Sequence, residues 1–282
     1  VKLKGDSTVI KALNNNMVLV KDNGIEKIIL AKGIGFNKKP GDIISENIDI
    51  DKIFSIEDEK NQMNLKEVYN RVDGGFVAVC EEAIAEICEE LDEELNESIH
   101  IGLIDHLALA IKRLKNKEEI SNPFIVEIET LYNVEFEMAK KIIKKLQRKY
   151  RVKFPQGEIG FITLHIHSAR NGRKLSNTIK YSYLANRIVA HIEKRFNAKI
   201  NKRSLDYARF LSHIRFTIER ILTDTLLKND LIDAIKESYP ISYEIAEEVS
   251  KIIETSLDKK VQEDEIAYIA MHIERFRLTL CK

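Results

Sequence analysis

Histidine is the residue type through which this chain could most readily do chemistry, and only seven occur in 282 residues. Two of them, His165 and His167, lie in an otherwise apolar run, FITLHIHSAR, at residues 161–170. A histidine side chain can bind a metal ion, act as a base or carry a covalent group. The positions of the other histidines decide which of these uses fits.

The chain contains an internal repeat with one fixed offset. The segment DHLALAIKR at 105–113 returns as SHIRFTIER at 212–220, and GEIGFITLHI at 157–166 returns as DEIAYIAMHI at 264–273. Two separate motifs with the same offset indicate a duplicated domain, because a solenoid unit would be much shorter. Four histidines occupy matched positions in the two copies: His106, His165, His213 and His272.

Metal binding and hydrolysis are poorly supported by these positions. A zinc site needs three or four ligands, usually with histidines one turn apart or nearby cysteines, and no such pattern accompanies the repeated histidines. A hydrolase needs a nucleophile, a base and an orienting group. Asp105 precedes His106, but Ser212 takes its place in the second copy, so no catalytic set is repeated. We expect no catalytic residues, no metal and no cofactor.

A histidine that accepts a phosphoryl group fits better. Such a residue needs an exposed ring nitrogen and cationic neighbours. Arg113 and Arg220 lie two helical turns after His106 and His213, and Arg275 lies one turn after His272. A phosphoryl group would add negative charge to a helical surface, so the site would act as a switch. His167, two positions after His165, points to another helical face and is expected to be structural, as are His100 and His191.

The periodicity predicts two kinds of structure. In residues 1–56, β-branched runs alternate with turn signals, which predicts a small antiparallel sheet of about four strands. From Leu65 onward, apolar residues recur at helical spacing. The predicted fold is a small all-β domain at 1–57 followed by two all-α helical-bundle domains at 66–170 and 173–279.

Composition places limits on the partners and the location. Lysine plus arginine equals aspartate plus glutamate at 45 each, so any nucleic-acid site must be local. Cys80, Cys88 and Cys281 are few and odd in number, which is typical of a reducing compartment. Without a long apolar run or a signal pattern, we expect a cytoplasmic protein with no membrane insertion.

The N-terminal segment combines residue types that suit unpaired RNA. Lys11 to Asn16 and Ala31 to Lys39 bring together lysines, asparagines, glycines and Phe36 beside short strands. Lysine can contact phosphates, asparagine can read base edges, and an aromatic ring can stack on an unpaired base. The alternative is a turn-rich sheet in which these residues serve only the hairpins. So small a domain has little core, which favours pairing with a second copy.

The ordered motifs resemble those of a known family over essentially the whole chain. They are similar to bacterial transcriptional antiterminators of the BglG/SacY/LicT group, and most similar to the GlcT-type branch that controls the glucose phosphotransferase operon. The resemblance is carried by Asn14-Asn15-Asn16, Gly33-x-Gly35-Phe36-x-Lys38-Lys39, Asp105-His106, GFITLHI at 160–166, HIRFTIER at 213–220 and MHIER at 271–275.

The resemblance implies a co-antiterminator domain that dimerises, binds a bulged hairpin in nascent leader mRNA and keeps a terminator from forming. It also implies two phosphotransferase-system regulation domains whose histidines receive phosphoryl groups from HPr or a sugar-specific enzyme II. The implied RNA-binding residues are Lys11, Asn15, Lys32, Gly33 and Phe36. The implied phosphoacceptors are His106, His165, His213 and His272.

One departure and two rival functions accompany the resemblance. Ala31-Lys32 stands where many relatives carry Gly-Arg, and lysine lacks the planar bidentate contact of arginine. The first rival is a DNA-binding activator with the same regulation domains, which would require a helical N-terminal segment. The second, more distant rival is a metal-dependent phosphohydrolase, which would contain stoichiometric zinc.

Overall fold

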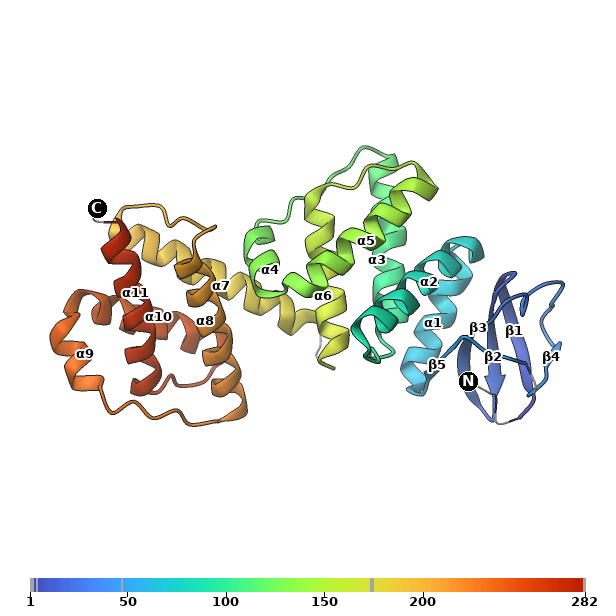
Figure 1. Cartoon of the computed structure of the whole chain (residues 1–282), viewed down its shortest axis with the longest axis horizontal. Helices are drawn as coiled ribbons and strands as arrows, with labels where there is room; N and C mark the ends of the chain where they lie inside the picture. Colours follow the sequence, from blue (N-terminus) through green and yellow to red (C-terminus); the bar gives the residue numbers. More distant parts are fainter. Residues whose placement is uncertain (1–2, 4, 47, 173–174, 281–282) are drawn as a thin grey trace. The chain divides into compact units, whose positions relative to one another are not determined.

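A computed structural model describes residues 3, 5–46, 48–172 and 175–280 (Figure 1). Within this part of the chain, an antiparallel sheet is followed only by helices, so the predicted fold class is confirmed. Cys80 and Cys88 are buried free thiols, and Cys281 lies outside the described residues. No helix in the described ranges is both long and apolar enough to cross a membrane.

The sheet has five strands in its described residues, one more than expected, in the order β4-β1-β2-β3-β5. All of its neighbouring strands are antiparallel. Between β2 and β3, Asn23 and Gly24 have φ values of 48° and 89°, which matches the two-residue hairpin turn that suits twisted strands. The strands are β1 (Ser7–Asn14), β2 (Met17–Asp22), β3 (Ile25–Leu30), β4 (Ile43–Ile44) and β5 (Lys52–Ile56).

Both faces of this sheet are buried, because apolar residues alternate between them. Val18 and Val20 join a small core on one face, which the loop residue Ile34 completes. Leu19 and Ile28 point to the other face and join the core of the first helical bundle. Positions 1–56 contain no helix in their described part, so they lack the element that the DNA-binding rival requires.

Two helices of the first copy of the repeat begin and end at positions that match those of helices in the second copy. Helices α4 and α5 begin and end at positions that the offset maps onto the bounds of α9 and α10. Arg151 and Asp258, which the same offset relates, both have positive φ values, of 53° and 55°. The helices are α1 (Glu59–Arg71), α2 (Gly74–Leu91), α3 (Ile99–Lys115), α4 (Ile125–Leu131), α5 (Asn133–Tyr150), α6 (Gln156–Arg170), α7 (Leu175–Phe196), α8 (Leu205–Thr223), α9 (Ile232–Ser238), α10 (Pro240–Leu257) and α11 (Glu263–Leu280).

The chain forms two compact units that do not follow the two copies of the repeat. The first unit is Val1–Ser121 with Glu137–Arg173, and the second is Asn122–Phe136 with Lys174–Lys282. The second unit thus includes α4, which comes from the first copy in sequence. Helix α4 packs against α7 and α8, whereas its counterpart α9 packs against α10 and α11 of its own copy.

A buried carboxylate anchors α4 in the second unit. Glu127 is fully buried and accepts hydrogen bonds from the Tyr207 hydroxyl at 2.7 Å and from Lys202 Nζ at 2.6 Å. Burial alone would raise the pKa of Glu127, but the hydrogen bonds from Lys202 and Tyr207 outweigh it and lower that pKa. The charge of Glu127 is therefore compensated inside the core of the second unit.

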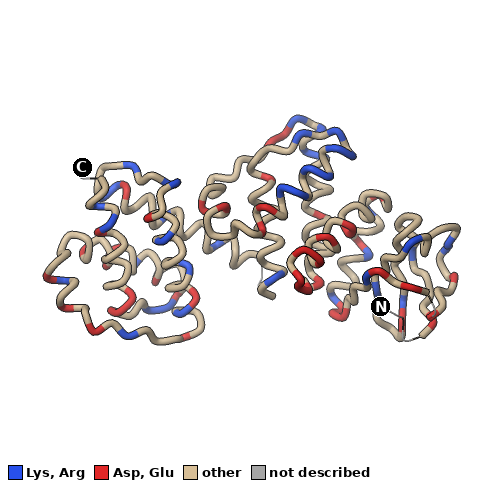
Figure 2. Tube along the Cα trace, in the orientation of Figure 1, with Lys and Arg blue, Asp and Glu red and all other residues tan. Residues whose placement is uncertain are grey.

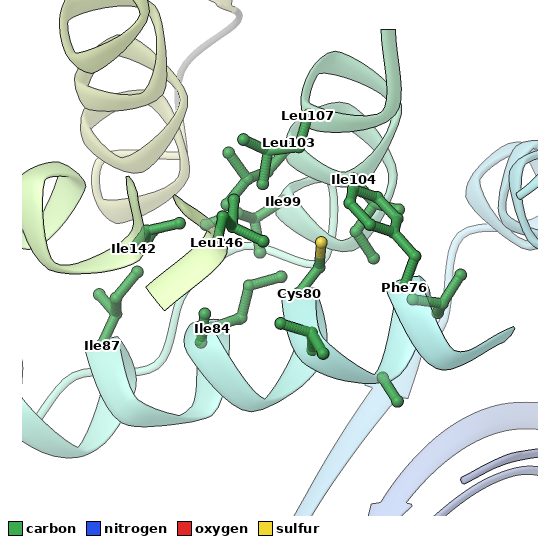
Figure 3. Close-up of a cluster of buried hydrophobic side chains, with 14 of the residues drawn as sticks. Phe76, Cys80, Ile84, Ile87, Ile99, Leu103, Ile104, Leu107, Ile142 and Leu146 are labelled. Carbon is green, nitrogen blue, oxygen red and sulfur yellow. The ribbon is translucent and has the colours of Figure 1, made fainter. Parts of the chain in front are cut away.

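Apolar side chains at helical spacing build the core of the first bundle. Helix α2 starts at the N-cap Asp73, whose side chain accepts a hydrogen bond from the Phe76 backbone N–H. From there Phe76, Cys80 and Ile84 point to the same side, toward α3 and α5 (Figure 3). This packing fixes α3, and with it the first of the repeated histidines.

Candidate functional sites

The first histidine pair lies where α3 packs against α6. His106 on α3 and His165 on α6 have ring centroids 5.2 Å apart, and the Phe161 ring lies 5.8 Å from His106. Gly102 on α3 makes room for this arrangement, because a Cβ atom there would come within 3.2 Å of His165 Nδ1. Two histidines far apart in sequence thus form one site.

A buried carboxylate holds His106. Glu158, in the first turn of α6, has a side chain only 1% exposed and lies 2.9 Å from His106 Nε2 through Oε2. Its other oxygen accepts a hydrogen bond from Arg113 Nη2 at 2.8 Å. Burial would raise the pKa of Glu158, but the hydrogen bonds and charges of His106 and Arg113 outweigh it and lower that pKa.

This contact assigns the tautomer of neutral His106. An ionised carboxylate can only accept hydrogen bonds, so Nε2 must carry the hydrogen and the lone pair lies on Nδ1. Burial is the main cause that lowers the pKa of His165 to about 3, so His165 is neutral near pH 7. A buried Nε–H of Arg113 has no hydrogen-bond acceptor in the described part of the chain, which leaves one donor beside the site.

The second pair lies at the equivalent contact between α8 and α11. The rings of His213 and His272 are 4.7 Å apart, and Tyr268 stands where the first site has Phe161, 5.7 Å from His213. Glu265 and Arg220 take the positions of Glu158 and Arg113, with Arg220 Nε 2.5 Å from Glu265 Oε1. The same four residues, two histidines, a glutamate and an arginine, are therefore present in both copies.

The hydrogen bonds of the second site differ. Glu265 Oε2 accepts bonds from Thr217 Oγ1 and Arg220 Nη2, both at 2.7 Å. His213 Nε2 is buried and has no hydrogen-bond partner among the residues that the structure describes. Burial and the charge of His272 lower the pKa of His213 to about 4. Burial and Arg275 also lower the pKa of His272.

The sequence identified the histidines but missed their carboxylates. Glu158 and Glu265 lie second in the repeated GEIGF and DEIAY motifs, so an acid matched at the offset of the repeat was the available signal. Arg113 and Arg220, expected beside a phosphoryl group, pair with these acids. Among the described residues, no cluster of three or more histidine, cysteine and acidic side chains could hold a metal ion.

The three remaining histidines contact other groups. His100 Nδ1 is buried 2.6 Å from Glu81 Oε2, and His191 Nε2 lies 2.6 Å from Glu248 Oε2. His167 is buried near the Asn171 amide, while its neighbour in sequence, His165, faces His106. The two histidines of FITLHIHSAR therefore belong to different surroundings.

At one end of the sheet, a turn and a loop are hydrogen-bonded to each other. The backbone N–H of Gly33 donates to Asn16 Oδ1 at 2.8 Å, and that of Gly35 donates to the Asn15 carbonyl at 3.0 Å. Only glycine fits at 35, since a Cβ atom there would lie 2.0 Å from the Asn14 carbonyl oxygen. The next residue, Phe36, is 62% exposed.

Four of the five expected RNA-binding residues share this turn and loop. Asn15, Lys32, Gly33 and Phe36 are exposed there. Lys11 lies on β1, where its half-buried ammonium donates a 2.5 Å hydrogen bond to the Tyr69 carbonyl of α1. The structure therefore groups the first four and ties Lys11 to the helical bundle.

Comparison with known proteins assigns the chain to a family. Residues 8–63 match the CAT RNA binding domain, and residues 81–169 and 186–276 each match the PRD domain. The chain is 40% identical over 280 residues to the PtsGHI operon antiterminator of Bacillus subtilis, with 98% of this chain and 99% of the relative covered. The chain belongs to the family of PRD-containing antiterminators. The two helical copies are its PRD domains, and the sheet is its CAT domain.

Other members of this antiterminator family are similar over the same length. Protein GlcT of Staphylococcus saprophyticus is 35% identical over 273 residues, which cover 96% of this chain and 97% of that protein. A crystal structure of GlcT CAT-PRDI matches with a TM-score of 0.51 and 41% identity. That match covers 59% of this chain and 99% of the solved one.

Proposed function

We propose that this antiterminator binds a bulged hairpin in nascent leader mRNA and keeps the overlapping terminator from forming in a phosphotransferase-system sugar operon. In this proposal, HPr and a sugar-specific enzyme II phosphorylate its four repeated histidines, and the active form is a homodimer. The observation that carries the proposal is the pair of matched histidine sites, each with a buried glutamate and an arginine. The domains are 1–57, 66–170 and 173–279.

The geometry of the first PRD domain supports His106 as a phosphoacceptor. With Nε2 held by Glu158, the lone pair on Nδ1 can attack the phosphorus of a phosphorylated donor protein. The new N–P bond replaces the bond between the phosphorus and the donor's own side chain, and that side chain leaves with the electron pair of the broken bond. Glu158 then stabilises the hydrogen on Nε2 and the positive charge that the ring acquires.

Phosphorylation would also change the charges around Arg113. A phosphoryl group carries close to two negative charges at pH 7 and would compete with Glu158 for the guanidinium. The free Nε–H of Arg113 offers a donor for it. Since α3 and α6 pack through these residues, the added charge favours a different packing of the first PRD domain, and the dimer closes only when that charge is absent.

The RNA contact uses the joined turn and loop of the CAT domain. Phe36 can stack on an unpaired base, Lys32 can contact phosphate, and Asn15 can bond a base edge. Gly33, with φ of 73°, lets the backbone approach the RNA closely. For Lys11 to contact RNA, its hydrogen bond to the Tyr69 carbonyl must open.

A binding measurement tests this function. The full chain is titrated with the leader RNA of the neighbouring sugar-transport operon. Phe36→Ala should weaken binding about 5- to 150-fold, because stacking on one base is worth about 1–3 kcal/mol. Phe216→Ala removes another exposed phenylalanine, from the second PRD domain, and should leave binding unchanged. The proposal fails if the wild-type chain ignores the leader RNA at low salt or if Phe36→Ala binds as wild type does.

A further inference from the structure

Helix α5 of the first PRD domain carries an unusual charge. Residues 138–153 contain eight lysines and arginines and no acidic residue, and Figure 2 shows this basic stretch as blue along α5. In the second PRD domain, residues 245–260 hold four acidic residues and three lysines. The two segments occupy equivalent helices, so this charge is not a requirement of the PRD fold.

Basic side chains gather at one end of the first bundle, which we call the basic pole. Lys112 and Lys115, in the last turn of α3, line the same hollow as Tyr150, the last residue of α5. The pole consists of eight exposed residues: Lys112, Lys115, Lys117, Lys144, Arg148, Lys149, Arg151 and Lys153. Their counterparts in the second copy of the repeat are Glu219, Leu222, Asp224, Lys251, Thr255, Ser256, Asp258 and Lys260.

The cations of the basic pole differ from their neighbours on α5 in their ion pairs. Lys141 and Lys145, nearer the middle of α5, form ion pairs with Glu90 and Glu86 of α2. None of the eight residues of the basic pole has an ion pair in the part of the chain that the structure describes. So many like charges repel one another, and a bound polyanion would relieve that repulsion.

The shape and chemistry of the pole favour phosphates over a protein. A hollow of about 510 Å³ on α5 is lined only by Lys141, Lys144, Lys145, Arg148 and Lys149. Protein interfaces usually have a core of apolar and aromatic residues, which this hollow lacks. Its five cations lie on one helical face over about 12 Å, which exceeds the spacing of successive phosphates in a nucleic-acid strand. Lys144, Arg148 and Lys149 belong to the basic pole, while Lys141 and Lys145 are the two that pair with α2.

We propose that the basic pole binds the sugar-phosphate backbone of RNA, as a second, sequence-independent contact beside the CAT domain. The chain already has an RNA-binding domain in the same compact unit, so RNA is the polyanion at hand. Backbone contacts of this kind add affinity and salt dependence but no base selectivity. The inference rests on the proposed RNA binding only for the identity of the natural target.

The test compares two triple variants of the full chain. Lys144→Gln, Arg148→Gln and Lys149→Gln together remove three cations of the pole. Lys228→Gln, Lys251→Gln and Lys260→Gln together remove three exposed lysines of the second unit as a matched control. Binding to the leader RNA and to an unrelated double-stranded RNA is measured between 50 and 200 mM salt, a range in which about two or three phosphate contacts are readily seen.

The slope of log K against log salt is negative, and the pole variant should make it less steep by about 2 to 3 on both RNAs, since each phosphate contact contributes about 0.7 to 0.9. The control should keep the wild-type slope. A wild-type slope for the pole variant overturns the inference. If that variant keeps the wild-type slope but is no longer phosphorylated, the basic pole binds a protein partner instead. If the wild-type chain binds the unrelated RNA but not the leader RNA, the proposed function fails. The salt slope on the unrelated RNA then still tests whether the basic pole binds RNA.

Discussion

The two histidine sites have the same four residues, two histidines, a glutamate and an arginine, but different hydrogen bonds. In the first PRD domain Glu158 binds His106, whereas in the second the matching Glu265 binds Thr217 and leaves His213 Nε2 without a partner among the described residues. Residue 110, the counterpart of Thr217, is alanine and offers no hydroxyl. The residue at this position, alanine or threonine, therefore differs between the site in which the carboxylate bonds a histidine and the site in which it bonds a hydroxyl.

The largest contrast is expected in phosphoryl transfer. Glu158→Gln should slow phosphorylation of the first PRD domain at least about tenfold, because the amide no longer fixes the tautomer or stabilises the charged ring of His106. Glu265→Gln should have a smaller effect on the second domain, since among the described residues Glu265 forms hydrogen bonds to Thr217 and Arg220 and none to a histidine. The measurement is the initial rate of acid-labile phosphate incorporation from enzyme I, HPr and the enzyme II. Equal slowing by both variants would contradict the contrast.

Removing the arginines should affect stability differently. Arg220→Ala leaves the buried Glu265 with only Thr217, so the free energy of unfolding should fall by about 3–5 kcal/mol. Arg113→Ala leaves Glu158 with its contact to the His106 ring, so the loss should be about 1–3 kcal/mol. Urea unfolding of both variants measures the difference. A larger loss for Arg113→Ala would show that His106 does not compensate Glu158.

The smallest effect is expected in how the free energy of unfolding depends on pH, through His213 of the second site. The pKa of His213 is about 4 in the fold and about 6.5 when unfolded, so the unfolded chain binds more protons between these values. The contribution of neutral His213 to the free energy of unfolding is therefore fully present above pH 6.5 and is lost as the pH falls toward 4. The loss is about 2 kcal/mol after allowance for solvent screening.

Thr217→Ala should reduce that decline. It frees Glu265 Oε2 to accept a hydrogen bond from His213, which raises the pKa of His213. NMR titration of the His213 ring measures the pKa, and urea unfolding at several pH values measures the decline. Thr223→Ala, which removes a hydroxyl bonded within its own helix, serves as the control. An unchanged pKa of His213 in Thr217→Ala would mean that Thr217 does not keep Glu265 from it.

Residue patterns in the chain predicted the sheet, the helices and which four histidines are matched between the copies, because each depends on local spacing and on the fixed offset of the repeat. The role of these histidines as phosphoacceptors stays a prediction. Helix α4 marks the limit of such patterns. It has the same length as α9 and shares its apolar spacing, yet it packs on α7 and α8. Glu127 on α4 is matched by Ala234, and only the tertiary structure shows that its partners are Lys202 and Tyr207.

Helices α1 and α4 pack in a similar way, each beside a buried glutamate that bonds a tyrosine, and this limits where the chain can be cut into fragments. Helix α1 packs on α3, where Tyr69 and His100 share Glu81, and α4 packs on α8, where Tyr207 binds Glu127. His100 and Tyr207 are themselves counterparts in the repeat. Each bundle is thus completed by a helix that precedes it in the chain. A fragment starting at 175 would leave Tyr207 without Glu127, and it would lack residues 122–136 of the second compact unit.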